Sequence, residues 1–264
     1  MKIFYAAFFA MLLVLVSCQE QNIEEIEVET QADTEISFYT PDSIKIFGDL
    51  YELDKSASTI LLFHQGGSNA RGEYSSIIPE LTERGYNVLA TDQRVGGQWY
   101  GSYNRTLANI PTHAYGDGYG YCDAYNNIES ALDYVIDSGF TGDKILWGSS
   151  YSAGLVIQLG SKRPDDIKGI LSFSPASGRA LQDCLPGQYL DSLSVPLIMI
   201  KPPHEMESEN SQKQMALAEE HGHQTYVPEY GVHGSSMLVE SRVGENVDAT
   251  WEVVYGFLDG LKAE

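Results

Sequence analysis

Residues 144–154, which read Lys-Ile-Leu-Trp-Gly-Ser-Ser-Tyr-Ser-Ala-Gly, join a short apolar run to a turn of small residues and the start of a helix. This order is typical of a nucleophile elbow, a strained strand-to-helix turn that raises one serine above the edge of a sheet. Small residues are needed two positions before and after that serine, because the turn brings their backbones together. Two registers satisfy this requirement, with the nucleophile at Ser150 or at Ser152.

The register centred on Ser150 is favoured by its neighbours. Gly148 follows directly on the last apolar residue of the expected strand, and the helix then begins at Tyr151. The Tyr151 amide, at the start of the helix, can donate to a developing oxyanion. The alternative without chemistry is a helix cap formed by Ser149 or Ser150.

Apolar runs alternate with amphipathic segments along the chain. The run 59–63 is apolar almost throughout, as expected of a strand buried on both faces of a parallel sheet. This alternation predicts an α/β fold with a mainly parallel sheet, helices on both faces, and chemistry at the carboxyl ends of the strands. The expected strands are 35–40 and 43–53, as an antiparallel pair, then 59–63, 87–91, 144–147, 167–174, 196–200 and 224–227. The expected helices are 73–84, 123–138, one starting at 151, 210–221 and 247–261.

Two further residue types are needed for a serine nucleophile to act. His233 lies in a loop of small residues between the last expected strand and the last helix, where an imidazole could accept the serine proton. The orienting acid should follow the strand 196–200. Glu205 has the better spacing for a turn back over the sheet, and Glu207 remains the alternative because it lies nearer the next helix.

The loops after the strands 59–63 and 87–91 offer oxyanion donors and a substrate wall. His64-Gln65-Gly66-Gly67 places glycines where backbone amides can approach an oxyanion, so Gln65 or Gly66 is expected to donate together with Tyr151. The loop 92–122 is rich in glycine and tyrosine and is expected to line the substrate site. Its candidate substrate-binding residues are Trp99, Tyr100 and Tyr103.

The chain resembles α/β-hydrolases of the dienelactone-hydrolase-like kind. The resemblance rests on His64-Gln-Gly-Gly67, Asp92-Gln-Arg94, Gly148-Ser-Ser-Tyr-Ser152 and His233-Gly-Ser235, in the order serine, acid, histidine. It implies an eight-stranded α/β-hydrolase fold over residues 35–264 and acyl hydrolysis through an acyl-enzyme. Ser152 and Glu205 depart from the glycine and aspartate that are commoner in the family.

The first 34 residues are expected to be a leader and a tether. Residues 1–17 have one lysine followed by an apolar run too short to span a bilayer, as in a signal peptide. The sequence Leu15-Val-Ser-Cys18 resembles a bacterial lipobox, which implies lipidation of Cys18, export and attachment to a bacterial membrane, on its periplasmic face or at the cell surface. Residues 18–34 are acidic and are expected to form a flexible tether.

Composition narrows the range of partners. The formal net charge of −21 at pH 7, with no compensating basic cluster, argues against nucleic acid as a partner. No dinucleotide or phosphate loop is present, and the pair His221 and His223 lacks a third ligand, so no cofactor and no metal are expected. Cys122 and Cys184 could form a disulfide, which the sequence leaves open.

Together these features predict a serine hydrolase that cleaves small-molecule carboxylic esters or related acyl bonds. One alternative is a carbohydrate esterase that removes acetyl or feruloyl groups, which the aromatic loop and the export signal favour. Another is a catalytically inactive hydrolase fold that serves as a surface binding lipoprotein. The occurrence of elbow, oxyanion glycines, acid and histidine in one consistent order favours an enzyme.

Overall fold

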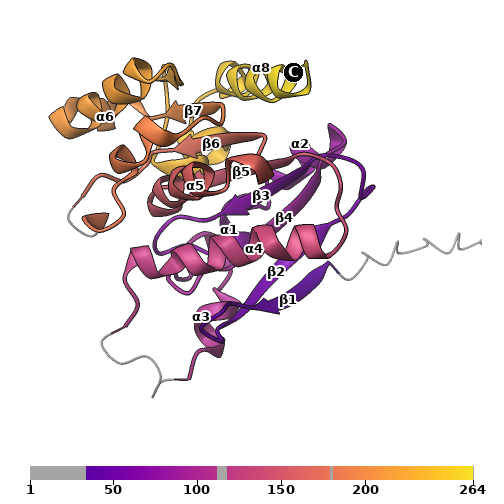
Figure 1. Ribbon diagram of the computed structural model, residues 1–264. Coiled ribbons are helices and arrows are strands. Elements are labelled where there is room, and N and C mark those ends of the chain that lie inside the picture. The colour runs from indigo at the N-terminus through magenta and orange to yellow at the C-terminus, as the bar shows by residue number, and fades with distance from the viewer. Residues whose placement is uncertain (1–33, 112–117, 179–180, 264) are drawn as a thin grey trace, which may run out of the picture. The chain divides into compact units, whose positions relative to one another are not determined.

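The computed structural model describes residues 34–111, 118–178 and 181–263 of the chain. They belong to one unit, Thr34–Glu264. Its centre is an eight-stranded sheet with the order β1-β2-β4-β3-β5-β6-β7-β8 (Figure 1). The strands are β1 (Glu35–Tyr39), β2 (Lys45–Tyr51), β3 (Thr59–Phe63), β4 (Asn87–Thr91), β5 (Lys144–Ser149), β6 (Gly169–Phe173), β7 (Leu197–Ile200) and β8 (Gln224–Tyr226).

The direction of the strands changes only at one side of the sheet. β1 pairs antiparallel with β2, and β2 pairs antiparallel with β4, whereas the six strands from β4 to β8 run parallel. The carboxyl ends of the parallel strands therefore share one edge, and the loops that follow them meet there. All residues of β3 and β4 are buried, which agrees with the apolar runs in the sequence.

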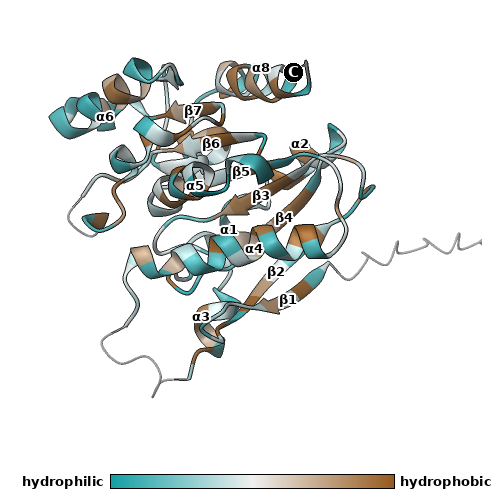
Figure 2. Cartoon of the chain, viewed as in Figure 1, coloured by the Kyte–Doolittle hydropathy of each residue, from teal (hydrophilic) through white to brown (hydrophobic). Residues whose placement is uncertain are grey.

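Helices cover both faces of the sheet. Alternate strand residues enter two separate cores: Leu61 and Phe63 pack with residues of α4, α5 and α6, and Ile60 and Leu62 pack with residues of α1, α2 and α8. Figure 2 shows the matching pattern, with hydrophobic strands and helices that are hydrophobic along one side. The helices are α1 (Ala70–Tyr74), α2 (Ile78–Glu83), α3 (Arg105–Asn109), α4 (Tyr125–Asp137), α5 (Tyr151–Lys162), α6 (Glu209–Glu220), α7 (Glu240–Val243) and α8 (Asp248–Ala263).

One predicted helix is wrong in its extent. The segment 73–84 was expected to be continuous, but the structure divides it into α1 and α2 and starts α1 three residues earlier, at Ala70. The Asn69 side chain caps α1 by accepting a hydrogen bond from the Gly72 amide. Pro79 has no amide hydrogen and fits only in the first turn of a helix, so α2 begins afresh at Ile78.

The loop after β4 contains structure that the sequence did not predict. Trp99–Gly101 forms a short 3₁₀ turn in which Tyr100 has a φ of 66°. Asn104 then caps α3 by accepting a hydrogen bond from the Leu107 amide. The backbone of Trp99 is held as well, because its amide donates to the Gly67 carbonyl oxygen and its own carbonyl oxygen accepts a hydrogen bond from the Asn69 side chain.

Candidate active site

Ser150 occupies the sharp turn between β5 and α5. Its φ of 61° and ψ of −115° form a conformation that residues other than glycine rarely adopt, and that stores strain. The two sides of the turn are so close that a Cβ atom on Gly148 would lie 2.5 Å from the Ser152 carbonyl oxygen. Glycine is therefore required two positions before Ser150, as the elbow pattern implies.

The three serines of this stretch differ in their surroundings. Ser150 is partly exposed, and its side chain does not cap α5. Ser152 is fully buried, and its hydroxyl donates a 2.6 Å hydrogen bond to the His64 carbonyl oxygen. Ser149 is also fully buried, and its hydroxyl oxygen accepts a hydrogen bond from the Ser235 amide. Of these three hydroxyls, the one at Ser150 is placed to meet a substrate.

His233 and Glu205 come together at the same edge of the sheet. Glu205 lies in the 3₁₀ turn Pro203–Glu207 after β7, and His233 lies in the loop after β8. Nδ1 of His233 is 2.6 Å from Oε1 of Glu205. A proton on Nδ1 satisfies this contact and leaves Nε2 free to accept a proton. Glu207, the other candidate acid, is exposed.

The second oxygen of Glu205 faces a buried lysine. Nζ of Lys201 is 3.4 Å from Oε2 of Glu205 and donates a 2.9 Å hydrogen bond to the Pro175 carbonyl oxygen. Burial lowers the pKa of Lys201, and the charge of Glu205 opposes that effect. Burial by itself would raise the pKa of Glu205, but the hydrogen bond from His233 and the charge of Lys201 hold it below its usual value. The carboxylate therefore stays ionised between two partners.

The loop that carries His233 packs against the elbow. The Gly234 amide donates a 3.0 Å hydrogen bond to the Ser174 hydroxyl oxygen, and the Ser235 amide donates one of 3.0 Å to Ser149 Oγ. Ser149 immediately precedes Ser150, so His233 is held close to the turn. The Ser150 hydroxyl has no hydrogen-bond partner among the residues described. In structures without substrate the contact from nucleophile to base is often open.

His64 anchors two loops from inside the protein. It is fully buried, with Nδ1 2.8 Å from the Gln65 carbonyl oxygen and Nε2 accepting a 2.9 Å hydrogen bond from the Gln93 amide. Burial lowers its pKa, which favours the neutral imidazole. These bonds join the loop after β3 to the loop after β4, which fixes the position of the glycines that follow.

Of the two candidate oxyanion donors in this loop, the structure leaves Gly66. The Gln65 amide donates a 2.8 Å hydrogen bond to Oε2 of Glu73, a fully buried carboxyl group whose pKa is raised by burial. That bond removes Gln65 from the candidates. The Gly66 amide makes no backbone hydrogen bond within the described segments. Tyr151 is the first residue of α5, where an amide has no helical carbonyl to bond.

Two of the three predicted substrate-binding residues border the loop 64–67 that carries the candidate oxyanion donors. A Cβ atom on Gly67 would lie 2.9 Å from the Trp99 ring, and Trp99 as a whole is 58% exposed. The Tyr100 hydroxyl accepts hydrogen bonds from Gln65 Nε2, at 3.2 Å, and from Ser236 Oγ, at 3.1 Å. Tyr103 is 54% exposed. Trp99 and Tyr100 thus form an aromatic border that contacts Gly67 and Gln65.

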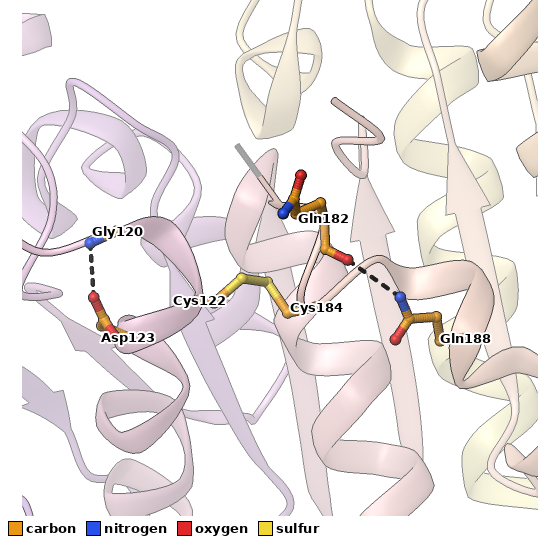
Figure 3. Close-up of a disulfide and its surroundings, with 6 residues drawn as sticks. All are labelled: Gly120, Cys122, Asp123, Gln182, Cys184 and Gln188. Carbon is orange, nitrogen blue, oxygen red and sulfur yellow. Dashed lines mark hydrogen bonds between the residues drawn. A yellow bond between two sulfur atoms is a disulfide. The ribbon is translucent and has the colours of Figure 1, made fainter. Parts of the chain in front are cut away.

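A disulfide connects two of the loops on this edge. Cys122, just before α4, is bonded to Cys184, in the segment between β6 and β7 (Figure 3). The turns on either side have their own hydrogen bonds. The Gly120 amide donates to Asp123, and the Gln188 side chain donates to the Gln182 carbonyl oxygen. The pairing that the sequence left open is therefore present.

The sequence did not identify three residues that support this site. Lys201 and Ser174 each follow the last residue of a parallel strand directly, and that position is the signal that could have found them. Glu73 lies within a short helix, where an acid is normally expected to be exposed. Its burial beneath the loop 64–67 depends on how α1 packs.

The described residues contain neither a metal-binding cluster nor a helix able to span a membrane. Over 34–111, 118–178 and 181–263, no group of histidine, cysteine, aspartate and glutamate side chains is arranged to hold a metal ion. In the same ranges no helix has both the length and the apolar character that crossing a bilayer needs. The predicted signal peptide, Cys18 and the acidic tether up to residue 33 lie outside the described residues.

Comparison with solved structures defines the fold. No family model matches the sequence, and no curated protein matches it. The topology and its structural neighbours show that the chain has the α/β-hydrolase fold, with a mostly parallel sheet of eight strands. This agrees with the fold class predicted from the sequence.

Three of these neighbours carry descriptions of their activity or ligand. An esterase from Pyrococcus furiosus is 17% identical with a TM-score of 0.64, covering 86% of this chain and 90% of its own. Est1E from Butyrivibrio proteoclasticus, in a structure with bound ferulic acid, is 14% identical with a TM-score of 0.64, covering 87% and 100%. A dienelactone hydrolase from Anabaena variabilis is 12% identical with a TM-score of 0.60, covering 86% and 98%.

Proposed function

We propose that this protein is a serine hydrolase that cleaves carboxylic esters or related acyl bonds, with Ser150 as nucleophile, His233 as base and Glu205 as orienting acid. The observation that carries the proposal is the placement of Ser150 on a strained turn, beside a loop that holds His233 against Glu205. The esterases and the dienelactone hydrolase among the structural neighbours support it.

The first half of the reaction acylates the serine. Nε2 of His233 accepts the hydroxyl proton while Oγ of Ser150 forms a bond to the ester carbonyl carbon. The carbonyl electron pair moves onto the oxygen, which accepts hydrogen bonds from the Gly66 and Tyr151 amides. Glu205 holds the imidazole through Nδ1 and stabilises its positive charge. The protonated histidine then gives its proton to the departing alcohol.

The second half releases the acid. A water molecule gives a proton to His233 and attacks the acyl carbon, which passes through a second oxyanion at the same donors. Collapse of this intermediate returns the proton to Ser150 Oγ and frees the carboxylic acid. Each group returns to its starting state, so the reaction requires no further reagent.

An esterase that acts on acylated carbohydrate is the second candidate. Trp99 is exposed and its ring lies beside the loop 64–67, where it could stack against a sugar or a phenolic acyl group. The ferulic acid found in Est1E supports this candidate. Comparing turnover of feruloyl and acetyl sugar esters with that of simple aryl esters distinguishes the two functions.

The proposed function is tested by covalent labelling of the purified protein with a fluorophosphonate, followed by peptide mapping. We expect one adduct, on Ser150, and we expect Ser150→Ala to lose both the adduct and aryl ester turnover. Ser149→Ala is the matched control. It should keep the adduct on Ser150, because the Ser149 hydroxyl is fully buried and out of reach of the label; the rate of labelling should fall only partly, since losing the bond to the Ser235 amide loosens the loop of His233.

Two other results would change the proposal. An adduct on Ser152 would keep the enzyme class and move the nucleophile by two residues. A folded wild-type protein that takes up no label and hydrolyses no ester would replace the enzyme with an inactive hydrolase fold that binds a partner at its surface.

Export and lipid attachment through Cys18 form the last part of the proposal. Its support is the apolar leader and the lipobox resemblance, both of which belong to the sequence. A tether rich in acids would then separate the catalytic domain from the membrane.

A further inference from the structure

The Tyr121 hydroxyl lies against the backbone of the proposed oxyanion donor Gly66. A Cβ atom on Gly66 would be 2.7 Å from this oxygen and 3.2 Å from two carbons of the same ring. Any residue larger than glycine at position 66 would therefore displace Tyr121. Within the described chain the hydroxyl has no hydrogen-bond partner, and its oxygen is not completely buried. It is thus free to donate to a ligand.

The ring of Tyr121 is held in place by the other donor residue. It stacks on the Tyr151 ring with 4.7 Å between centroids and 22° between planes. Tyr151 is itself fixed, because it is almost fully buried and its hydroxyl donates a 3.0 Å hydrogen bond to the Val95 carbonyl oxygen. The phenol therefore touches the residues of both backbone donors, Gly66 and Tyr151.

The chain next to Tyr121 is covalently fixed. Cys122 follows it directly and is bonded to Cys184 (Figure 3). A tyrosine at the end of a long loop would otherwise lose conformational freedom each time it met a substrate. With the backbone fixed on one side and the ring stacked on the other, the hydroxyl is placed in advance, which is the condition under which a donor stabilises a transition state most effectively.

We propose that the Tyr121 hydroxyl donates a third hydrogen bond to the oxyanion that forms on the substrate, beside the Gly66 and Tyr151 amides. This inference rests on the proposed function. As Ser150 Oγ bonds to the carbonyl carbon, the carbonyl electron pair moves to the oxygen, and that oxygen accepts hydrogen bonds from the three donors. The phenol keeps its proton throughout, because the serine proton goes to His233.

The test is Tyr121→Phe, which keeps the stacked ring and removes only the hydroxyl. We expect kcat on a short aryl ester to fall on the order of 10²-fold, with KM changed little, because an oxyanion accepts this bond more strongly than a ground-state carbonyl does. Affinity for a trifluoromethyl ketone, which forms an oxyanion on addition of serine, should fall by a similar factor. Tyr125→Phe is the matched control, since its hydroxyl contacts Glu129 on α4 and its loss should leave kcat unchanged.

A purely structural role for Tyr121 predicts a different result. If the ring only lines the site, Tyr121→Phe will keep kcat and the ketone affinity within about twofold, and the proposal is overturned while the labelled wild type still supports the enzyme. If the wild type neither labels nor turns over, both proposals fall together. Should Tyr121→Phe fold poorly, 3-fluorotyrosine at position 121 replaces it, and an unchanged kcat with this more acidic phenol also overturns the third donor.

Discussion

Lys201 is a buried ammonium group next to the carboxylate that orients His233. Its side chain is 2% exposed and that of Glu205 is 15% exposed, so their charges act on one another with little screening by water. Lys201→Met removes the charge and keeps most of the volume. Without this charge the pKa of Glu205 should rise. As pH falls, the carboxylate should therefore become protonated at a higher pH than in the wild type. We therefore expect the acid limb of kcat/KM to move to higher pH.

The measurement is the pH profile of kcat/KM, together with a carbon-13 titration of the Glu205 carboxyl group. Lys213→Met is the control, because Lys213 is 70% exposed on α6 and pairs with Glu209 at the surface. An acid limb and a Glu205 titration that both stay in place in Lys201→Met would show that the lysine does not act on the acid.

At this scale the sequence pointed to the proposed catalytic residues more readily than to the buried residues that contact them. Ser150 and Glu205 could be proposed because each follows an apolar strand, and His233 because it follows the last expected strand in the same chain order. The Glu73 contact with the Gln65 amide could not, because it depends on the orientation of α1 beneath the loop. The choice between Gln65 and Gly66 depended on that contact and needed the structure.

Among the elements, strands were predicted more accurately than helices and loops. β3 and β4 are buried on both faces, and each was predicted with the bounds that the structure shows. The helix expected at 73–84 was wrong because amphipathic spacing continues across the break before α2, although Pro79 interrupts the backbone bonds. α3 was missed because it is short and lies inside a loop rich in glycine and tyrosine.

The disulfide provides a prediction about the segments it joins. Cys122 and Cys184 are 62 residues apart, and closing a loop of that length stabilises a fold by about 4 kcal/mol if the effect is entropy of the unfolded chain. We expect the double variant Cys122→Ser/Cys184→Ser to lose about 2–4 kcal/mol of unfolding free energy in urea. A reductant should destabilise the wild type by a similar amount and leave the double variant unaffected.

That comparison also has a result that would contradict it. If the double variant and the oxidised wild type unfold at the same urea concentration, the bond adds nothing to the free energy of unfolding. Activity should be measured on the same samples, because Tyr121 precedes Cys122 directly, and a freer loop should lower kcat more than it changes KM.

For the molecule as a whole, the proposed lipid anchor can be tested by changing Cys18 alone. Expressed in bacteria, the full chain should incorporate an alkyne-tagged fatty acid and fractionate with membranes, because Cys18 ends a lipobox-like sequence. Cys18→Ser should abolish both. The double variant of Cys122 and Cys184 is the control and should retain the label. If Cys18→Ser keeps the label, the lipid is attached at another residue. If the control loses the label, the labelling does not report on Cys18 alone. Either result would contradict the proposed anchor.

The bond between Cys122 and Cys184 also makes the molecule partly circular. The closed ring contains α4, β5, the elbow at Ser150, α5 and β6, whereas Glu205 and His233 lie on the open chain beyond it. A protease that cuts once inside this ring leaves one covalent molecule, which separates into two fragments only in a reducing gel. A cut between residues 184 and 264 separates fragments without reductant. Ser150 thus lies in a section of chain whose two parts stay joined by the disulfide after a single cut.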